Sequence, residues 1–277
     1  MDDIPLPLCD KPFRLTDQLR QCMRVKHLSY STEKIYIYWI LNFIRFHNRR
    51  HPSQMGSLEV DSYLSFLAIT RKVSPNTQSL ALNALIFLFH RFLEKELGDL
   101  HFTRPQYRKK PPVVFTHDEA MNVINLIDTT PHYLMAKLMY GSGLRLMECC
   151  RLRIKDIDFG MNEIMIRCGK GNRDRHTLLP TSLIEPLQAQ IKKVSALHNY
   201  DTEMGFGEVW LPHALARKYP NAAGSLLWAY LFPAANPAAD PETGKLRRHH
   251  IHTSVMQKKV RVAIKRSGVL KLASTHT

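Results

Sequence analysis

The sequence lacks the features of membrane-spanning and secreted proteins. No apolar run approaches the roughly 20 residues that cross a bilayer as a helix. The opening stretch, MDDIPLPLCDKPF, does not have the basic and then apolar order of a signal peptide. These absences predict a cytoplasmic protein that has no membrane partner.

The cysteines do not form a pattern. There are five, none of them in a C-x-x-C pair, and an odd, unspaced set argues against both a disulfide framework and a zinc site. We expect reduced thiols at Cys9, Cys22, Cys149, Cys150 and Cys168.

Acidic side chains are scarce relative to basic ones. The chain has 39 Lys and Arg against 24 Asp and Glu, a formal net charge of +15. Such an imbalance is typical of a surface that neutralises phosphates, although a positive charge that only maintains solubility would give the same composition. A polyanion is therefore the leading candidate partner.

The length of 277 residues, with 44% hydrophobic content, favours two domains over one. Apolar residues at helical spacing predict four helices in the first hundred residues. The first is DQLRQCMRVKHL. The second follows Ser31-Thr32, with Thr32 as its cap. The third opens at Ser57, with Leu58, Leu64 and Leu67 as its apolar members, and the fourth runs from Ser74-Pro75 to Gly98.

A basic, proline-rich stretch, RPQYRKKPPVVF, follows these helices. Its composition predicts an extended linker over residues 104–115, between a helical domain at 1–103 and a second domain at 116–277. Two domains joined in this way could sit on opposite sides of a rod and close around it. We expect phosphate contacts from Arg104, Arg108, Lys109 and Lys110, although a solvated face is the alternative for any single charge.

The second domain combines helices with one hairpin. Thr116 begins a capping box, and further helices follow from Pro131 and at RLMECCRLR. A β-hairpin is predicted next, from the alternation in EIMIRC, the turn at GKGN and the following RDRHTLLP. Helices are expected again at SLIEPLQAQIKKVSAL and SVMQKKVRVAIKRSG, with a loop-rich stretch at 200–250. The predicted fold is mainly α with a small β-hairpin or sheet.

Two basic residues carry candidate chemistry. Gly143 permits a tight turn that places Arg145 at a helix start, where outward backbone N–H groups could help to hold a phosphate. Lys170 lies between glycines at the hairpin tip, where its ammonium could donate a proton. Each alone is weak evidence, because surface arginines and hairpin lysines are common.

Together, GSGLRLMECCRLRIKDIDF and CGKGNRDRHTLLP resemble the tyrosine recombinases, which have a G-x-R box followed by a G-K-G hairpin, with an acid, here Glu148, three residues after the arginine. The resemblance implies a helical core-binding (SAM-like) domain and a mixed α/β catalytic domain that clamp DNA. It also implies tetramers on DNA and no metal or other cofactor.

The segment 205–260 is similar to the extra segment of the integron integrases, and we therefore expect an integron-type insert at about 200–250, called the insert below. Integron integrases are bacterial enzymes that exchange cassette sites and recognise at least one site as a folded single-stranded hairpin. Trp210, Trp228 and Tyr230 could stack on projecting bases, although aromatic residues at such spacing are more often core. His249, His250 and His252 could suggest a metal, but they lack a partnering Cys or acidic cluster. Contacts to phosphates or bases are expected from Arg247, Arg248, His249 and His250.

The resemblance also implies the catalytic set. Two arginines hold the phosphate oxygens, a lysine assists the leaving 5′-oxygen, a histidine transfers protons and a tyrosine forms a 3′-phosphotyrosine. Arg145 and Lys170 match the first arginine and the lysine, and His276 matches the start of the H-x-x-R box, in which the chain stops. None of the ten tyrosines follows that box.

We therefore expect a catalytic domain that is incomplete at its C-terminus. The chain is either a partial record of an active integron integrase, nucleoid-associated in its host, or a truncated product that binds DNA without catalysis. A nucleic-acid-binding protein unrelated to recombination is a third, remote class.

Overall fold

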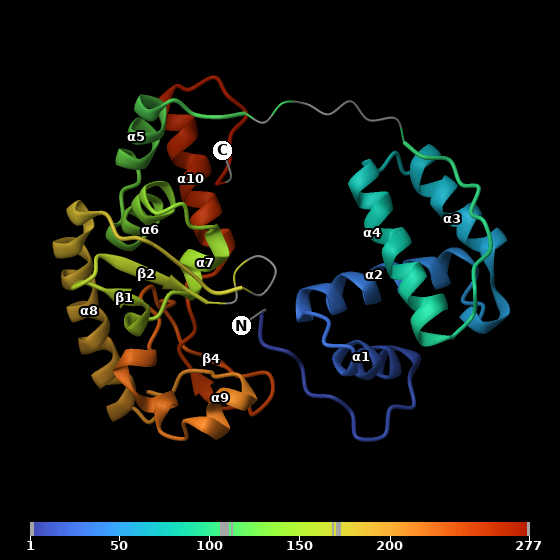
Figure 1. Ribbon diagram of the computed structural model, residues 1–277, viewed down its shortest axis with the longest axis horizontal. Coiled ribbons are helices and arrows are strands. Elements are labelled where there is room, and N and C mark those ends of the chain that lie inside the picture. Colours follow the sequence, from blue (N-terminus) through green and yellow to red (C-terminus); the bar gives the residue numbers. More distant parts are fainter. Residues whose placement is uncertain (1–2, 106–110, 112, 168, 170–172, 276–277) are drawn as a thin grey trace. The chain divides into compact units, whose positions relative to one another are not determined.

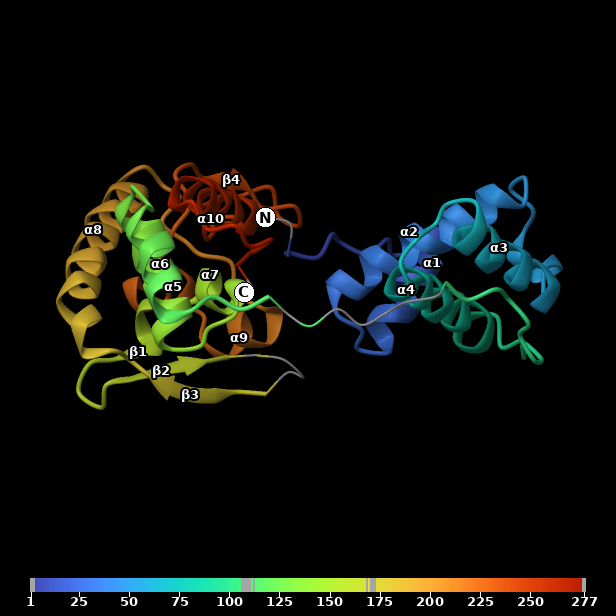
Figure 2. The ribbon, with the colours of Figure 1, turned by 90° about the horizontal axis from the view of Figure 1, so that it is seen from above.

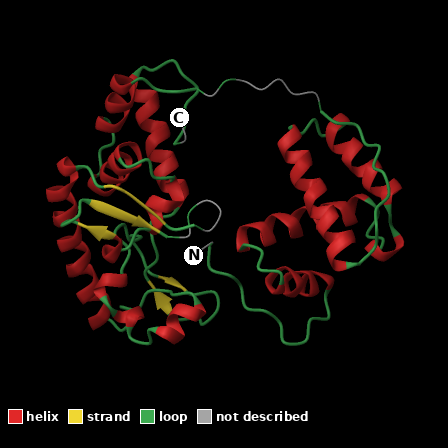
Figure 3. Cartoon of the chain, in the orientation of Figure 1, coloured by secondary structure: helices red, strands yellow, loops and turns green. Residues whose placement is uncertain are grey.

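The computed structural model describes residues 3–105, 111, 113–167, 169 and 173–275. The chain divides into two compact units, residues 2–110 and residues 111–277, and the boundary falls within the stretch 104–115. Helices dominate both units, and the strands lie in the second (Figure 3). The predicted fold class, mainly α with a small sheet, is confirmed.

The N-terminal unit is helical, as predicted. Its elements are α1 (Leu15–Val25), α2 (Tyr30–Phe46), a 3₁₀ turn (Pro52–Gln54), α3 (Ser57–Ile69), α4 (Pro75–Ile86) and a π-helical turn (Phe87–Phe92). Phe43 of α2 meets Tyr63 of α3 and Phe89 edge to face, with ring centroids 5.6 and 6.0 Å apart. These three rings are buried and join the helices in one core.

Three details of this unit differ from the predictions. The cap of α2 is Ser29, whose Oγ accepts the Thr32 amide at 3.2 Å, so Thr32 lies inside the helix. Leu58 is 81% exposed because it lies on the outer face of the first turn of α3. The fourth helix ends through the π-helical turn rather than at Gly98, and the consecutive residues Phe87, Leu88 and Phe89 of that turn are all buried.

The C-terminal unit contains six α-helices among the residues that the structure describes. They are α5 (His117–Asn125), α6 (Thr130–Gly141), α7 (Leu146–Arg151), α8 (Ile184–Glu203), α9 (His213–Lys218) and α10 (Thr253–Ser267). The predicted capping box of α5 is confirmed: Thr116 Oγ1 accepts the Glu119 amide at 3.2 Å, and Glu119 Oε2 accepts the Thr116 amide at 2.7 Å. No helix in the described ranges is both long and apolar enough to cross a membrane.

The predicted hairpin is confirmed within a three-stranded antiparallel sheet. The strands β1 (Ile157–Asp158), β2 (Glu163–Ile166) and β3 (Arg175–Leu178) lie in that order, and Ile166 pairs with Arg175. Figure 2 shows this sheet along one side of the unit and α10 on the opposite side, with α6 and α7 between them. Ile164 and Ile166 are buried against this helical layer, which fixes the sheet beside α7.

The stretch 200–250 is more ordered than the predicted loop. The end of α8, helix α9 and a two-stranded ribbon of β4 (Ala238–Ala239) and β5 (Leu246–Arg247) lie within it. Val209, Leu211 and Ala222 form a small separate core, against which Trp228 packs. Short 3₁₀ turns lie at Ile154–Asp156, Thr181–Leu183, Ala222–Gly224 and Leu226–Trp228.

Candidate active site and nucleic-acid interface

A tight turn presents Arg145 to solvent. Gly143 has φ +63°, a left-handed conformation that glycine adopts without steric cost. Leu144 and Leu146 are both buried, so the extended backbone of Arg145 between them directs its side chain outward. The side chain is 51% exposed at the N-cap of α7. This is the place predicted for an anion-binding arginine.

Glu148 connects this turn to the hairpin. Its Oε1 accepts Arg145 Nη1 at 2.9 Å and Arg175 Nη1 at 2.8 Å, and its Oε2 accepts the Arg145 amide at 2.9 Å and Arg175 Nη2 at 2.7 Å. The amide of Arg145 is therefore occupied and is not one of the backbone N–H groups that could hold a phosphate. What Arg145 presents is its guanidinium.

The bidentate contact from Arg175, followed by the bonds from Arg145, lowers the pKa of Glu148 to about 2 despite its burial. Glu148 is therefore a carboxylate at any physiological pH. Two guanidinium groups around one carboxylate leave one net positive charge at this surface, which is suitable for a phosphodiester.

The base of the hairpin approaches this cluster closely. A Cβ on Gly169 would lie 3.0 Å from Arg175 Nη1 and 3.3 Å from Glu148 Oε1, closer than a side chain normally comes. A side chain here would require these groups to shift by a few tenths of an ångström. Lys170 and His276 lie outside the described residues, and their catalytic roles stay predictions.

A second cationic cluster, absent from the sequence-based predictions, lies where β1 meets the insert. Arg153 donates to the carbonyls of Trp228 at 2.6 Å and Trp210 at 3.1 Å, and its guanidinium lies 4.5 Å from the ring centroid of Tyr230. Lys155 lies 2.9 Å from the ring centroid of Trp228. Burial is the main cause that lowers the pKa of Lys155 to about 8. Only the tertiary fold joins these residues, so no sequence signal indicated the cluster.

These contacts bear on the predicted stacking residues. Tyr230 is buried, and Trp228 packs against the small core of the insert with Lys155 over its ring. For Tyr230 the core alternative is confirmed. Base stacking by Trp228 stays a prediction, and it would require Lys155 to leave the ring face that it covers.

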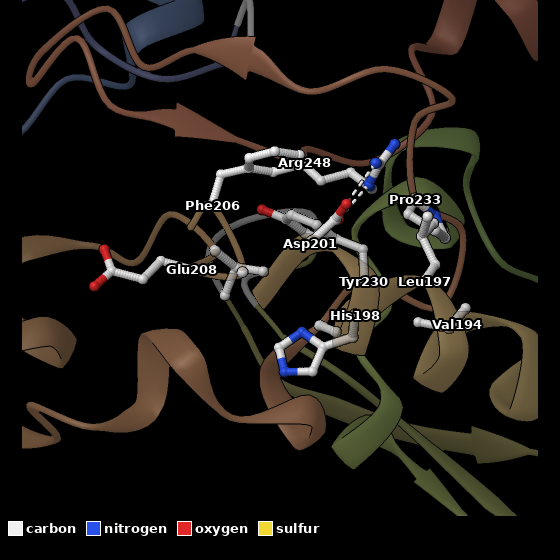
Figure 4. Close-up of a pocket in the computed structure, with 12 residues that line it drawn as sticks. Val194, Leu197, His198, Asp201, Phe206, Glu208, Tyr230, Pro233 and Arg248 are labelled. Atoms are coloured by element: carbon white, nitrogen blue, oxygen red, sulfur yellow. Dashed lines mark hydrogen bonds and ion pairs between the residues drawn. The ribbon is translucent and has the colours of Figure 1, made fainter. Parts of the chain in front are cut away.

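Arg248 has partners within the unit. It is 9% exposed, and its Nε and Nη2 donate to Asp201 of α8 at 2.5 and 2.7 Å. Its Nη1 donates to the carbonyls of Ala234 and Ala235. Figure 4 shows the two charged side chains pointing toward one another across the insert. This geometry disfavours the predicted phosphate contact of Arg248.

The neighbouring basic residues are also engaged. Arg247 pairs with Asp240 and lies 3.5 Å from Glu208. The rings of His249 and His250 are 4.1 Å apart, and Tyr230 meets both edge to face. A cavity lined by Asp201, Tyr230, Arg248 and other residues (Figure 4) has a volume of about 20 Å³, enough for about one water and too small for a base.

Of the four linker residues predicted to contact phosphate, the structure describes Arg104. Its side chain is exposed, with the guanidinium 5.3 Å from the ring centroid of Phe102. Arg108, Lys109 and Lys110 lie outside the described residues.

Comparison with known proteins gives the family. Residues 15–99 match the model of the phage integrase N-terminal SAM-like domain, and residues 114–277 match that of the phage integrase family. The chain belongs to the phage integrase family, the tyrosine recombinases. It is 40% identical over 274 residues to an integrase/recombinase of Escherichia coli, covering 99% of this chain and 81% of the relative.

More distant relatives agree. The chain is 25% identical over 222 residues to the tyrosine recombinase XerA of Pyrococcus horikoshii, covering 76% of this chain and 73% of the relative. Among solved structures, XerH bound to a palindromic difH substrate covers 94% of this chain and 70% of its own, with 16% identity and a TM-score of 0.58. A lambda integrase tetramer bound to a Holliday junction covers 95% and 66%, with 14% identity and a TM-score of 0.56. These structures support the fold.

Proposed function

We propose that this chain acts in site-specific DNA recombination, in the integration and excision of integron cassettes. The observation that carries the proposal is the exposed Arg145, held by Glu148, which also binds Arg175 at the base of the hairpin, within the region that matches the phage integrase family. The similarity of the insert to the integron integrases supports the cassette reaction.

The chemistry proposed for the site is phosphoryl transfer. A tyrosine oxygen attacks the scissile phosphorus, the bond to the 5′-oxygen breaks, and that oxygen leaves with a proton. The guanidinium of Arg145 stabilises the charge that develops on a non-bridging oxygen. Lys170 supplies the proton to the leaving group, and His276 transfers protons around the phosphate.

We further propose that residues 1–277 by themselves bind DNA without cleaving it, since no tyrosine or second arginine follows His276 in this sequence. The test is a nicked suicide substrate, which traps phosphotyrosyl adducts. It is run on residues 1–277 and on an extended chain, defined as residues 1–277 joined to a family segment that carries the second arginine and the tyrosine. A covalent band from residues 1–277 would refute this proposal.

The same assay tests the enzymatic role. In the extended chain, Arg145→Ala and Lys170→Ala should each slow adduct formation, by on the order of 100- to 1,000-fold for the arginine. Normal adduct formation by Arg145→Ala would overturn the proposed site. If the extended chain binds DNA but forms no adduct, that result would favour the second candidate function, DNA binding without catalysis. The net charge of +15 also supports this second function.

The proposed cassette substrate is a folded hairpin with projecting bases. Trp228 and the His249–His250 pair are the residues proposed to meet those bases, and one stacking contact is worth about 1–3 kcal/mol. The two imidazoles are buried in this structure, so the insert has to rearrange before they can meet a base. His249→Ala with His250→Ala, or Trp228→Ala, should reduce the preference for hairpin over plain duplex and leave duplex affinity nearly intact. Equal losses on both DNAs would indicate a role in folding instead.

A further inference from the structure

The carboxylate of Glu148 has no acceptor capacity left. An ionised carboxylate offers about four lone-pair positions. Arg145 fills two of them, through Nη1 and its amide, and Arg175 fills the other two through Nη1 and Nη2. Glu148 therefore cannot accept a second N–H from the guanidinium of Arg145.

We propose that Arg175 is a positioning residue for the recombination reaction. By donating to both oxygens of the Glu148 carboxylate, Arg175 keeps the guanidinium of Arg145 directed at the scissile phosphate. The inference rests on the proposed function of Arg145. Arg175 itself needs no contact with DNA in this role.

The reason is a competition between two guanidinium groups for one carboxylate. An Arg–carboxylate pair is strongest as a bidentate fork, so an Arg145 left alone with Glu148 would turn to form it. That fork would direct two N–H groups inward and neutralise the charge that the phosphate needs. With Arg175 in place, Arg145 gives Glu148 a single side-chain N–H, and the rest of its 51% exposed side chain faces solvent.

Rigid elements hold Arg175 for this task. It is the first residue of β3, and its backbone pairs with Ile166, which is buried against the helices. Its bond to Glu148 spans 27 residues of sequence, so the sheet sets the distance between the hairpin and α7. The guanidinium fork matches the carboxylate geometry, and a lysine could not reproduce it.

The test uses the extended chain and measures single-turnover cleavage at saturating DNA. We expect Arg175→Ala to slow cleavage by on the order of 100-fold, as a misplaced catalytic group does, while DNA affinity stays near that of the parent chain and the protein remains folded at the assay temperature. Arg175→Lys should rescue little of the loss. Arg173→Ala removes an exposed arginine of the same hairpin and should keep the parent cleavage rate.

A second substrate separates positioning from general damage. A methylphosphonate at the scissile position lacks the negative charge that Arg145 stabilises, so the defects of Arg145→Ala and Arg175→Ala should shrink together on it. Arg175→Ala should also add little to Arg145→Ala in a double variant, because both act through one guanidinium.

The outcomes are distinguishable. If Arg145→Ala cleaves the natural phosphate normally, the proposed function fails and this inference fails with it. If Arg145→Ala is impaired but Arg175→Ala is not, only the inference fails. An Arg175→Ala defect that is equally large on the methylphosphonate, or that multiplies with that of Arg145→Ala, would also overturn the positioning role.

Discussion

The pairing of Arg248 with Asp201 leads to a prediction that opposes the sequence-based one. The side chains are 9% and 5% exposed, and Arg248 also donates to two carbonyls. Removing one partner of such a buried pair leaves an uncompensated charge and costs about 3–5 kcal/mol. In a unit of this size that cost corresponds to a drop of about 6–20 °C in the unfolding midpoint of Arg248→Met.

The assay combines calorimetry with DNA-binding titrations over a range of salt, at a temperature where the variant is folded. A phosphate contact would reduce the slope of log affinity against log salt by about 0.9, whereas the internal pair predicts an unchanged slope. Arg217→Met, an exposed residue of α9, is the matched stability control and should change stability by less than about 0.5 kcal/mol.

Replacing both partners, as in Asp201→Leu with Arg248→Met, should recover most of the lost stability, because no charge is then left buried. The reasoning would be refuted by an Arg248→Met protein that melts within about 2 °C of the parent and loses about one unit of salt slope. That result would make Arg248 a phosphate contact after all.

Further predictions concern DNA affinity, acid stability and the turn. DNA affinity should fall with salt by about 0.9 log units per phosphate contacted, and Arg104→Ala should reduce the slope by about one contact; a slope near zero would contradict a clamp. The pKa of Glu148 falls from 4.5 to about 2 on folding, so its contribution to stability is full above pH 4.5 and is lost as the pH falls toward 2. Glu148→Gln should therefore show a weaker decline in stability across this window, measured by acid titration of circular dichroism. Gly143→Ala meets open space and should cost only the strain of φ +63°, about 1 kcal/mol in denaturant unfolding.

Much of the fold could be predicted because it is specified locally. The helix periods of the N-terminal unit, the capping box at Thr116 and the alternation on either side of the G-K-G turn depend on residues a few positions apart. The turn at Gly143 was predicted for the same reason. Element ends were less reliable, since Ser29 and Thr32 are both residue types that cap helices and the structure has Ser29 at the cap.

The roles of individual basic residues were decided by tertiary structure. The sequence by itself determined the family resemblance, the excess of positive charge and the exposed place of Arg145. It did not determine that Glu148 joins Arg145 to Arg175, 27 residues further along, or that Arg248 lies against Asp201 across 47 residues. The sequence alone does not distinguish an arginine that faces a phosphate from one that faces a buried carboxylate. Its partner is chosen by which elements the hydrophobic core brings together, and that is a property of the packed chain.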